Sequence, residues 1–293
     1  MIPAEILKKV KRVELRTRKL VNTVFSGEYH SVFKGQGMAF SEVRGYQPGD
    51  EIRTIYWNVT ARMGEPFVKV FDEERELSVI LIVDASGSGD FGTVDQMKGE
   101  IAVEICALLA FSAIQNNDRV GLIIFTDEVE RYVPPKKGKK HVLRVIRELL
   151  YFQPEHRRTD VAEALDYLNC LNLRRSVVFM VSDFRSGDFE SALRAAKRKH
   201  DVIGISVHDP REEALPNVGI VELEDAETGE EILLDTSDAE TRALFERQYQ
   251  DRAAARVELF RSLGVDTIDV TTAEPYVDPL MRFFKARALK IRA

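Results

Sequence analysis

Five short apolar runs, each followed by a segment with helical periodicity, constrain the fold of this 293-residue chain more than any other feature. They cover residues 77–83, 119–125, 176–182, 202–207 and 265–270. Their positions are apolar in succession rather than alternately, so we expect both faces of each strand to be buried. Such strands form mostly parallel sheets with helices on both sides. The pattern therefore predicts a three-layer, doubly wound α/β fold of the Rossmann type.

The first 76 residues follow a different pattern. A basic amphipathic helix is predicted over residues 3–24, and packing on its own domain explains it better than membrane binding does. Residues 25–76 are rich in glycine and aromatic side chains, with a tight turn predicted at Gln47-Pro48-Gly49-Asp50. We therefore expect two parts: residues 1–76, an N-terminal helix with a small β-rich region, and residues 77–293, the α/β domain with a C-terminal helix.

Two further segments interrupt the regular alternation. Residues 218–235 place short apolar stretches on either side of Glu227-Thr228-Gly229-Glu230, which predicts a hairpin at the margin of the sheet. The basic stretch from Pro134 to Lys140 is predicted to be a turn.

Composition excludes several classes of protein. A net charge of −6 argues against a surface devoted to nucleic acid, and 44% hydrophobic residues suffice for a large core. No apolar run approaches the roughly 18 residues needed to cross a bilayer, and the N-terminus lacks the core of a signal peptide. Cys106 and Cys170 have no metal-site spacing, so we interpret them as reduced packing residues. These features predict a cytoplasmic protein without a transmembrane segment.

Oxygen-bearing side chains follow the predicted strands. Asp84, Ser86 and Ser88 come directly after the first run, Thr159 precedes a helical segment, and Asp183 ends the run at 176–182. The carboxyl ends of parallel strands meet at one edge of a sheet, so these groups are expected to converge. Carboxylate and hydroxyl oxygens suit a hard divalent cation, Mg²⁺ first and Mn²⁺ or Ca²⁺ as alternatives. Neutral hydroxyls would leave such an ion able to attract a carboxylate from another molecule.

The same five residues resemble a known motif. Asp84-x-Ser86-x-Ser88, then Thr159 and Asp183, is similar to the metal-ion-dependent adhesion site (MIDAS) of von Willebrand factor A-type (vWA) domains. The resemblance implies that the serines and the threonine contact the metal and that the aspartates bind it directly or through water.

A second resemblance covers nearly the whole chain. The N-terminal part contains Gly35-x-Gly37, Arg44-Gly45-Tyr46-Gln47-Pro48-Gly49-Asp50, Arg53-x-Ile55-x-Trp57 and Ala61-Arg62. These residues resemble the signature of the bacterial DUF58 family, whose members carry a vWA domain after it. Tyr56 departs from the aspartate common in that signature, and Gly89 from a methionine. The resemblance implies a cytoplasmic protein partner, a MoxR-type AAA+ ATPase.

Other interpretations of these residues stay open. Thr159 would also serve as an ordinary helix N-cap, and Asp183 could end its strand by accepting backbone hydrogen bonds. Arg157, Arg158 and Arg185 flank the predicted ligands and would form a rim that attracts an acidic partner. Tyr46 and Trp57 are expected to be buried, with nearby arginines paired to carboxylates such as Asp50.

Three functions remain in competition. The first is a non-enzymatic, magnesium-dependent protein-binding module, an adaptor or co-chaperone that takes an acidic side chain of its partner or client. The second is a metal-dependent phosphoester hydrolase, although none of the five histidines has a catalytic spacing. The third is dinucleotide binding, suggested by the glycine pattern at 87–92, which Asp84 and Asp90 would oppose with negative charge. The first is favoured.

Overall fold

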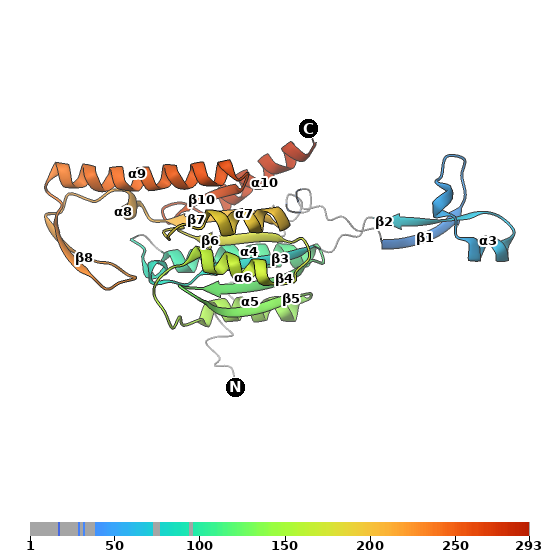
Figure 1. The fold of residues 1–293 in the computed structure, drawn as a ribbon, viewed down its shortest axis with the longest axis horizontal. Helices are drawn as coiled ribbons and strands as arrows, with labels where there is room; N and C mark the ends of the chain where they lie inside the picture. The colour runs from blue at the N-terminus through green and yellow to red at the C-terminus, as the bar shows by residue number, and fades with distance from the viewer. Residues whose placement is uncertain are drawn as a thin grey trace. The chain divides into compact units, whose positions relative to one another are not determined.

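The computed structural model describes residues 39–72, 77–93 and 96–292, together with the single positions Thr17, Tyr29 and Val32. The described residues belong to two compact units, and each is treated by itself. Residues 39–72 and Leu77 lie in the smaller unit, and residues 78–93 and 96–292 lie in the larger one with Thr17, Tyr29 and Val32 (Figure 1). The helix expected at 3–24 falls outside the described residues, apart from Thr17.

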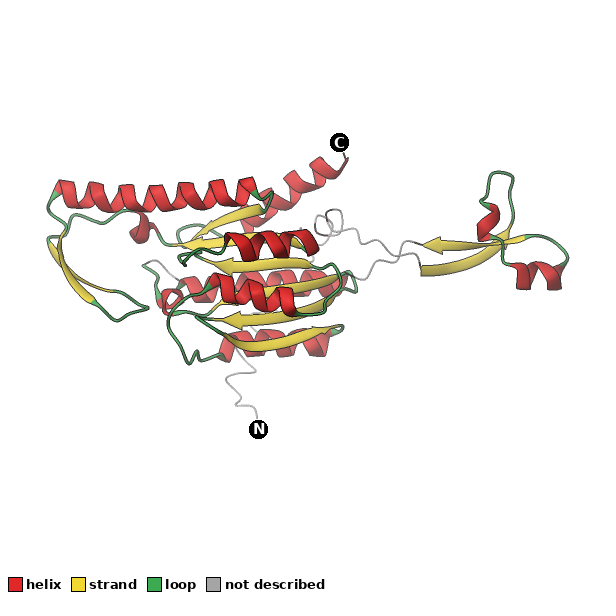
Figure 2. Cartoon of the chain, in the orientation of Figure 1, coloured by secondary structure: helices red, strands yellow, loops and turns green. Residues whose placement is uncertain are grey.

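The larger unit is a mixed α/β structure built on a six-stranded sheet, in the order β10-β7-β6-β3-β4-β5. Five strands are parallel, and β5 pairs antiparallel with β4 at one edge. This confirms a central, mostly parallel sheet flanked by helices (Figure 2). The strands are β3 (Ser78–Asp84), β4 (Arg119–Phe125), β5 (Val129–Lys136), β6 (Val177–Ser182), β7 (Asp201–His208) and β10 (Asp266–Thr271).

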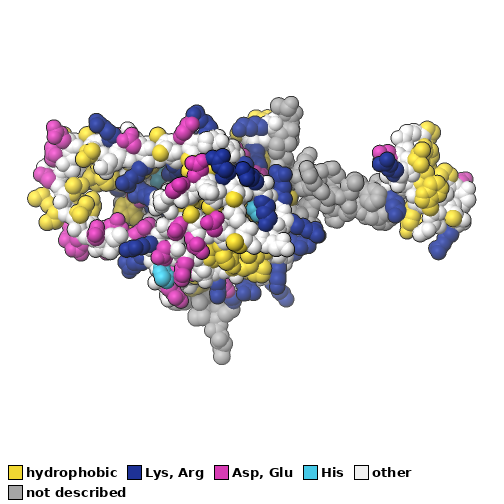
Figure 3. Space-filling view, in the orientation of Figure 1, with side chains coloured by type: hydrophobic (Ala, Val, Ile, Leu, Met, Phe, Trp, Pro, Cys, Tyr) yellow, Lys and Arg dark blue, Asp and Glu magenta, His cyan; other side chains and the backbone are white. Residues whose placement is uncertain are grey.

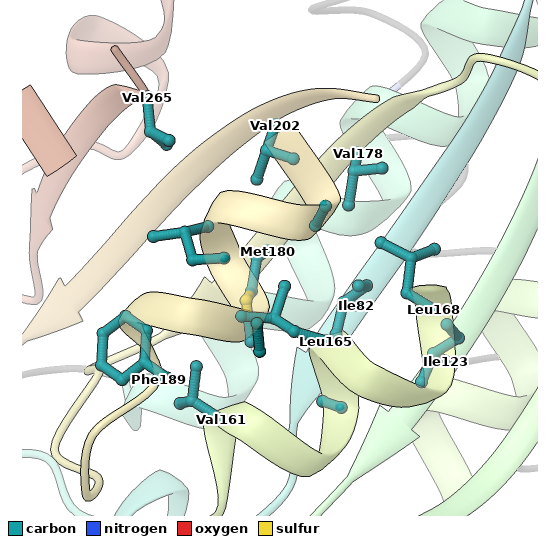
Figure 4. Close-up of a cluster of buried hydrophobic side chains, with 14 of the residues drawn as sticks. Ile82, Ile123, Val161, Leu165, Leu168, Val178, Met180, Phe189, Val202 and Val265 are labelled. Atoms are coloured by element: carbon teal, nitrogen blue, oxygen red, sulfur yellow. The ribbon is translucent and has the colours of Figure 1, made fainter. Parts of the chain in front are cut away.

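Helices cover both faces of the sheet because its strands are apolar on both sides. One face holds a cluster in which Ile82, Ile123 and Met180 of the sheet meet Leu165 and Phe189 (Figure 4). The helices α6 and α7 pack against each other over this face. The helices of the larger unit are α4 (Lys98–Gln115), α5 (Lys139–Tyr151), α6 (Val161–Cys170), α7 (Glu190–Lys199), α8 (Pro210–Glu213), α9 (Ala239–Ser262) and α10 (Val277–Arg292).

The opposite face of the sheet packs against other helices. Phe179 of β6 packs against Phe284 of α10 with the two rings tilted and their centroids 6.4 Å apart. Helix α4 is buried along almost its whole length, Cys106 included. Cys170 at the end of α6 is exposed, so the packing role predicted for the cysteines is wrong for this residue. Every helix in the described part of the chain is either too short or too polar to span a bilayer.

Two segments of the larger unit differ from their predictions. Residues Val129–Lys136 form the edge strand β5, although Pro134 and Pro135 indicated a turn; an edge strand tolerates proline because one side of its backbone needs no partner. The hairpin of β8 (Ile220–Glu224) and β9 (Glu231–Asp235) is present, but it forms a two-stranded sheet of its own rather than extending the margin of the main sheet.

The smaller unit pairs β1 (Ala39–Gly45) with β2 (Phe67–Asp72), and it also holds η2 (Ile52–Thr54) and α3 (Trp57–Met63). Asp50 accepts two hydrogen bonds from the Arg44 guanidinium, at 2.7 and 2.8 Å, so the predicted pairing is confirmed. Trp57 is 65% exposed, however, and the prediction that it is buried is wrong. A unit of this size cannot enclose every large side chain.

Candidate metal centre

The candidate site lies at β3, where the order in which strands are added to the sheet reverses. After β3 the chain adds β4 and β5 on one side of it, then crosses to place β6 on the other. Crevices that bind ligands in open α/β sheets lie at such a switch point, outside the carboxyl ends of the strands. Asp84 ends β3, and Asp183 directly follows β6. The topology therefore brings these two carboxylates together.

Asp84 is fixed by two neighbours. One carboxylate oxygen accepts a hydrogen bond from the Ser86 backbone at 2.9 Å, and the other accepts one from the Ser182 hydroxyl at 2.6 Å. No arginine, lysine or histidine of the described residues forms an ion pair with it. Burial, and then the negative charge of Asp183, raise the pKa of Asp84 to about 6. Asp84 thus carries a charge that its own surroundings do not compensate.

The two serines lie on the loop that follows. Gly87 to Asp90 form a short 3-10 helix, η3, and the hydroxyls of Ser86 and Ser88 approach each other to 3.1 Å. A small cavity of about 20 Å³ has Asp84, Ser88 and Asp183 in its wall. Helix α4 begins only at Lys98, so the glycine pattern at 87–92 does not open directly onto a helix N-terminus as a dinucleotide fingerprint would.

The Asp183 carboxylate forms an ion pair with a lysine of this chain. One of its carboxylate oxygens lies 2.9 Å from the Lys98 ammonium, and the other accepts the Arg185 backbone N–H at 3.1 Å. The same ammonium lies 2.9 Å from Glu212. Burial of Asp183 favours its neutral form, but the charge and hydrogen bond of Lys98, together with the Arg185 backbone and charge, outweigh burial and lower the pKa of Asp183. The pKa of Lys98 is raised, because Asp183 and Glu212 outweigh the effect of burial.

The backbone after Asp183 is held in an unusual conformation. Phe184 has φ of 58°, which is rare for a bulky residue. Its N–H donates to the Ser182 hydroxyl at 2.9 Å, and its ring packs edge-on against Phe260 with centroids 5.0 Å apart. A Cβ at Gly204 would lie 3.3 Å from both rings, a tight contact that glycine avoids. Core packing thereby fixes the turn that carries Asp183.

Thr159 reaches the site from a loop, and it does not cap α6. The N-cap is Asp160, whose carboxylate accepts from two backbone N–H groups, so the N-cap interpretation of Thr159 is wrong. Instead the Thr159 hydroxyl donates to Glu227 of the hairpin at 2.6 Å. Thr159, Asp183, Glu212 and Glu227 line a cavity of about 660 Å³ beneath α9, which is visible as a hollow in Figure 3.

The predicted rim is only partly free. Arg157 and Arg158 are exposed, and the Arg157 carbonyl accepts a hydrogen bond from the Gly87 N–H at 2.9 Å. The Arg185 side chain lies 3.4 Å from Glu212, so part of its charge is already compensated. Arg256 of α9, which the sequence did not single out, donates to the Asp183 carbonyl at 3.4 Å. The rim is therefore basic but locally neutralised.

The donor set fits a hard divalent cation. Among the described residues, no three His, Cys, Asp or Glu side chains are arranged to hold a metal, so hydroxyls must complete any coordination sphere here. Hydroxyl and carboxylate oxygens are the ligands that magnesium uses, and Asp84 lacks a compensating positive charge. The residues that would hold such an ion are Asp84, Ser86, Ser88, Thr159 and Asp183.

Besides Arg256, sequence reasoning missed three charged residues at this site. Lys98 had a detectable signal, because it shares its helix face with Ile101, Ala102 and Ile105, and a lysine on an apolar face needs a buried partner. No sequence signal marked Glu212 and Glu227 as site residues. Both belong to segments between β7 and β10, and only the tertiary fold brings these segments to the site.

Comparisons with known proteins place the chain in a family. The family model described as "Protein of unknown function DUF58" matches residues 42–255. The uncharacterized protein Mb1516 of Mycobacterium bovis is 32% identical over 282 residues, which is 95% of this chain and 88% of that protein. The uncharacterized protein YeaD of Bacillus subtilis is 28% identical over 37% of this chain and 25% of its own length.

Solved structures provide more distant neighbours. The conserved hypothetical protein BatB from Bacteroides thetaiotaomicron is 16% identical, with a TM-score of 0.47, and the match covers 73% of this chain and 99% of that one. An aerotolerance-related membrane protein from Bacteroides fragilis is 15% identical over the same shares, with a TM-score of 0.49. The family match covers most of the chain, and the mycobacterial relative aligns along nearly all of it. The chain therefore belongs to the DUF58 family.

Proposed function

We propose that this protein is a non-enzymatic, metal-dependent protein-binding module of the vWA type. Asp84, Ser86, Ser88, Thr159 and Asp183 would hold Mg²⁺, or Mn²⁺ or Ca²⁺, as a MIDAS does. The bound ion would supply positive charge and a coordination position for a carboxylate of the partner. In this proposal the protein acts in the cytoplasm as an adaptor or co-chaperone of a MoxR-type AAA+ ATPase.

The observation that carries the proposal is the uncompensated Asp84. A partly buried carboxylate with a pKa raised to about 6 is costly to keep ionised, and a nearby cation would lower that cost. Its neighbours are the Ser182 hydroxyl, the serines of the following loop and a second aspartate. These oxygen-bearing groups are the kind that hold a hard cation.

Calorimetry with Mn²⁺ and Mg²⁺ tests the metal site. Wild type should bind one equivalent of metal, and Asp84→Ala should bind none. Asp90→Ala is the matched control, because Asp90 lies on the same loop with an exposed side chain. Equal metal binding by wild type and Asp84→Ala would overturn the site.

Partner binding needs a separate measurement. The purified MoxR-type ATPase of the same organism should bind the immobilised wild-type protein in Mg²⁺ but not in chelator, and it should not bind Asp84→Ala. If the ATPase still binds in chelator and also binds Asp84→Ala, its recognition does not depend on the metal, and that part of the proposal is wrong.

A further inference from the structure

The hairpin of β8 and β9 touches the candidate metal centre with a carboxylate of this same chain. Glu227 lies in the turn, 68 positions after Thr159, and its carboxylate accepts a hydrogen bond from the Thr159 hydroxyl at 2.6 Å. Its side chain is partly buried there, although the adjoining Thr228, Gly229 and Glu230 are exposed. The contact is therefore a specific one between the turn and the site.

A second contact places the hairpin on the metal-site loop itself. A Cβ built on Gly87 would lie 2.2 Å from the Ala226 carbonyl oxygen and 2.9 Å from its carbon. Real Cβ atoms do not approach backbone so closely, so only glycine at position 87 allows the Ala226 carbonyl to pack against the loop at this point. The backbone of Gly87 does not adopt a positive φ, so this close approach is what requires glycine.

The turn is built to present Glu227. The Asp225 carboxylate accepts from the N–H groups of Glu227 and Thr228 at 2.8 and 3.0 Å, and the Gly229 N–H donates to the Asp225 carbonyl at 2.7 Å. Gly229 has φ of 71°, which a glycine adopts without cost. These bonds fix the turn before it meets the site, so little further ordering is needed to place the carboxylate.

The hairpin is weakly attached elsewhere. Its two strands pair only with each other, and Ile220 and Leu233 are 73% and 74% exposed. Figure 2 shows the hairpin beside the end of α9, with its turn directed at the loops that end the strands. Withdrawal of the turn would break no hydrogen bond of the six-stranded sheet. A segment of this kind can leave at low cost.

We infer that Glu227 is an internal ligand of the metal centre, which occupies the place that a partner's carboxylate would take. This inference rests on the proposed function, because it assigns to this chain's own glutamate the role proposed for the partner. A tethered carboxylate competes at an effective concentration that a free one must match. A partner therefore binds only the fraction of molecules in which the turn has withdrawn, and its apparent affinity falls by that fraction.

Acetate and Mn²⁺ serve as probes for this inference. The enhancement of ¹³C relaxation at the carboxyl carbon of acetate reports access to protein-bound Mn²⁺. In wild type we expect little enhancement. In Glu227→Gln, which keeps a hydrogen-bond acceptor but removes the charge, acetate affinity should rise about tenfold if the open form is about a tenth of the wild-type population. Glu230→Gln, an exposed residue of the same turn, is the control and should match wild type.

Gly87→Ala tests the same inference without altering any carboxylate. Its Cβ should displace the turn, so acetate should gain access as in Glu227→Gln. If Mn²⁺ binds normally but acetate access is unchanged in Glu227→Gln, the internal ligand is excluded while the metal site stands. If acetate gains access to Mn²⁺ in Gly87→Ala but not in Glu227→Gln, the turn blocks the site sterically. That result would also overturn the role of the Glu227 carboxylate as a ligand. If wild type and Asp84→Ala both fail to bind Mn²⁺, the proposed function fails and the inference with it.

Discussion

Two carboxylates end neighbouring strands of one sheet, yet the surroundings of Asp84 and Asp183 have opposite effects on them. Asp183 is paired with the buried Lys98, and its pKa is lowered. Asp84 has hydroxyl and amide donors but no cation, and its pKa is raised to about 6. The Asp183 side of the crevice is therefore compensated from within the chain, whereas the Asp84 side is prepared for a charge from outside.

The largest expected effect comes from removing the internal cation. Lys98→Met should lower the free energy of unfolding by about 3–5 kcal/mol, because Asp183 and Glu212 would stay buried without compensation. Urea denaturation measures the change. Lys199→Met, at an exposed lysine that contacts only a backbone carbonyl, is the control. A loss no greater than that of the control would show that the Asp183 side does not depend on Lys98.

The pH dependence of stability should have opposite signs at the two aspartates. In chelator, wild type should lose about 3 kcal/mol relative to Asp84→Asn as pH rises from about 4 to about 7, because the folded protein must ionise a group whose pKa is raised. Relative to Asp183→Asn, wild type should instead lose stability as pH falls below about 4, since that folded pKa is lowered. Urea unfolding curves of wild type and both variants, measured across this pH range, test both signs. If the stability differences for the two aspartates changed with pH in the same direction, the proposed contrast between Asp84 and Asp183 would be wrong.

Magnesium should stabilise the protein through the uncompensated side. At a hundredfold excess over the dissociation constant, ligand linkage adds about 2.7 kcal/mol to the free energy of unfolding. Thermal melts with and without Mg²⁺ should show this gain in wild type and in Asp90→Ala, and none in Asp84→Asn. A gain that survives Asp84→Asn would place the responsible ion elsewhere.

The smallest expected effect tests whether Ser182 stabilises the ionised form of Asp84. Ser182→Ala removes the hydroxyl that donates to Asp84 and accepts from Phe184, and it should cost about 1 kcal/mol. It should also raise the pKa of Asp84 further, which shifts the pH profile of stability to higher pH. Ser262→Ala, at an exposed serine, is the control for the loss of a hydroxyl. An unchanged pH profile would show that Ser182 does not support the ionised form.

The strand positions could be predicted because a strand that is buried on both faces appears in the sequence as a continuous run of apolar residues. The expected runs at 77–83 and 119–125 coincide within a residue with β3 and β4. The edge strand β5 was missed because its prolines indicate a turn unless the neighbouring strand is known. The exposure of Trp57 was missed because an aromatic residue is expected inside unless the unit is too small to enclose it.

By itself, the sequence determined the α/β class, the family and the order of the oxygen-bearing loops, because apolar runs and short motifs are written in adjacent residues. Only the tertiary structure decided which charges share the crevice. Lys98, Glu212 and Glu227 come from α4, α8 and a separate hairpin, and their meeting with Asp183 and Thr159 depends on where the strand order reverses. Charge compensation acts across space rather than along the chain, so the compensated and the uncompensated aspartate look alike in the sequence.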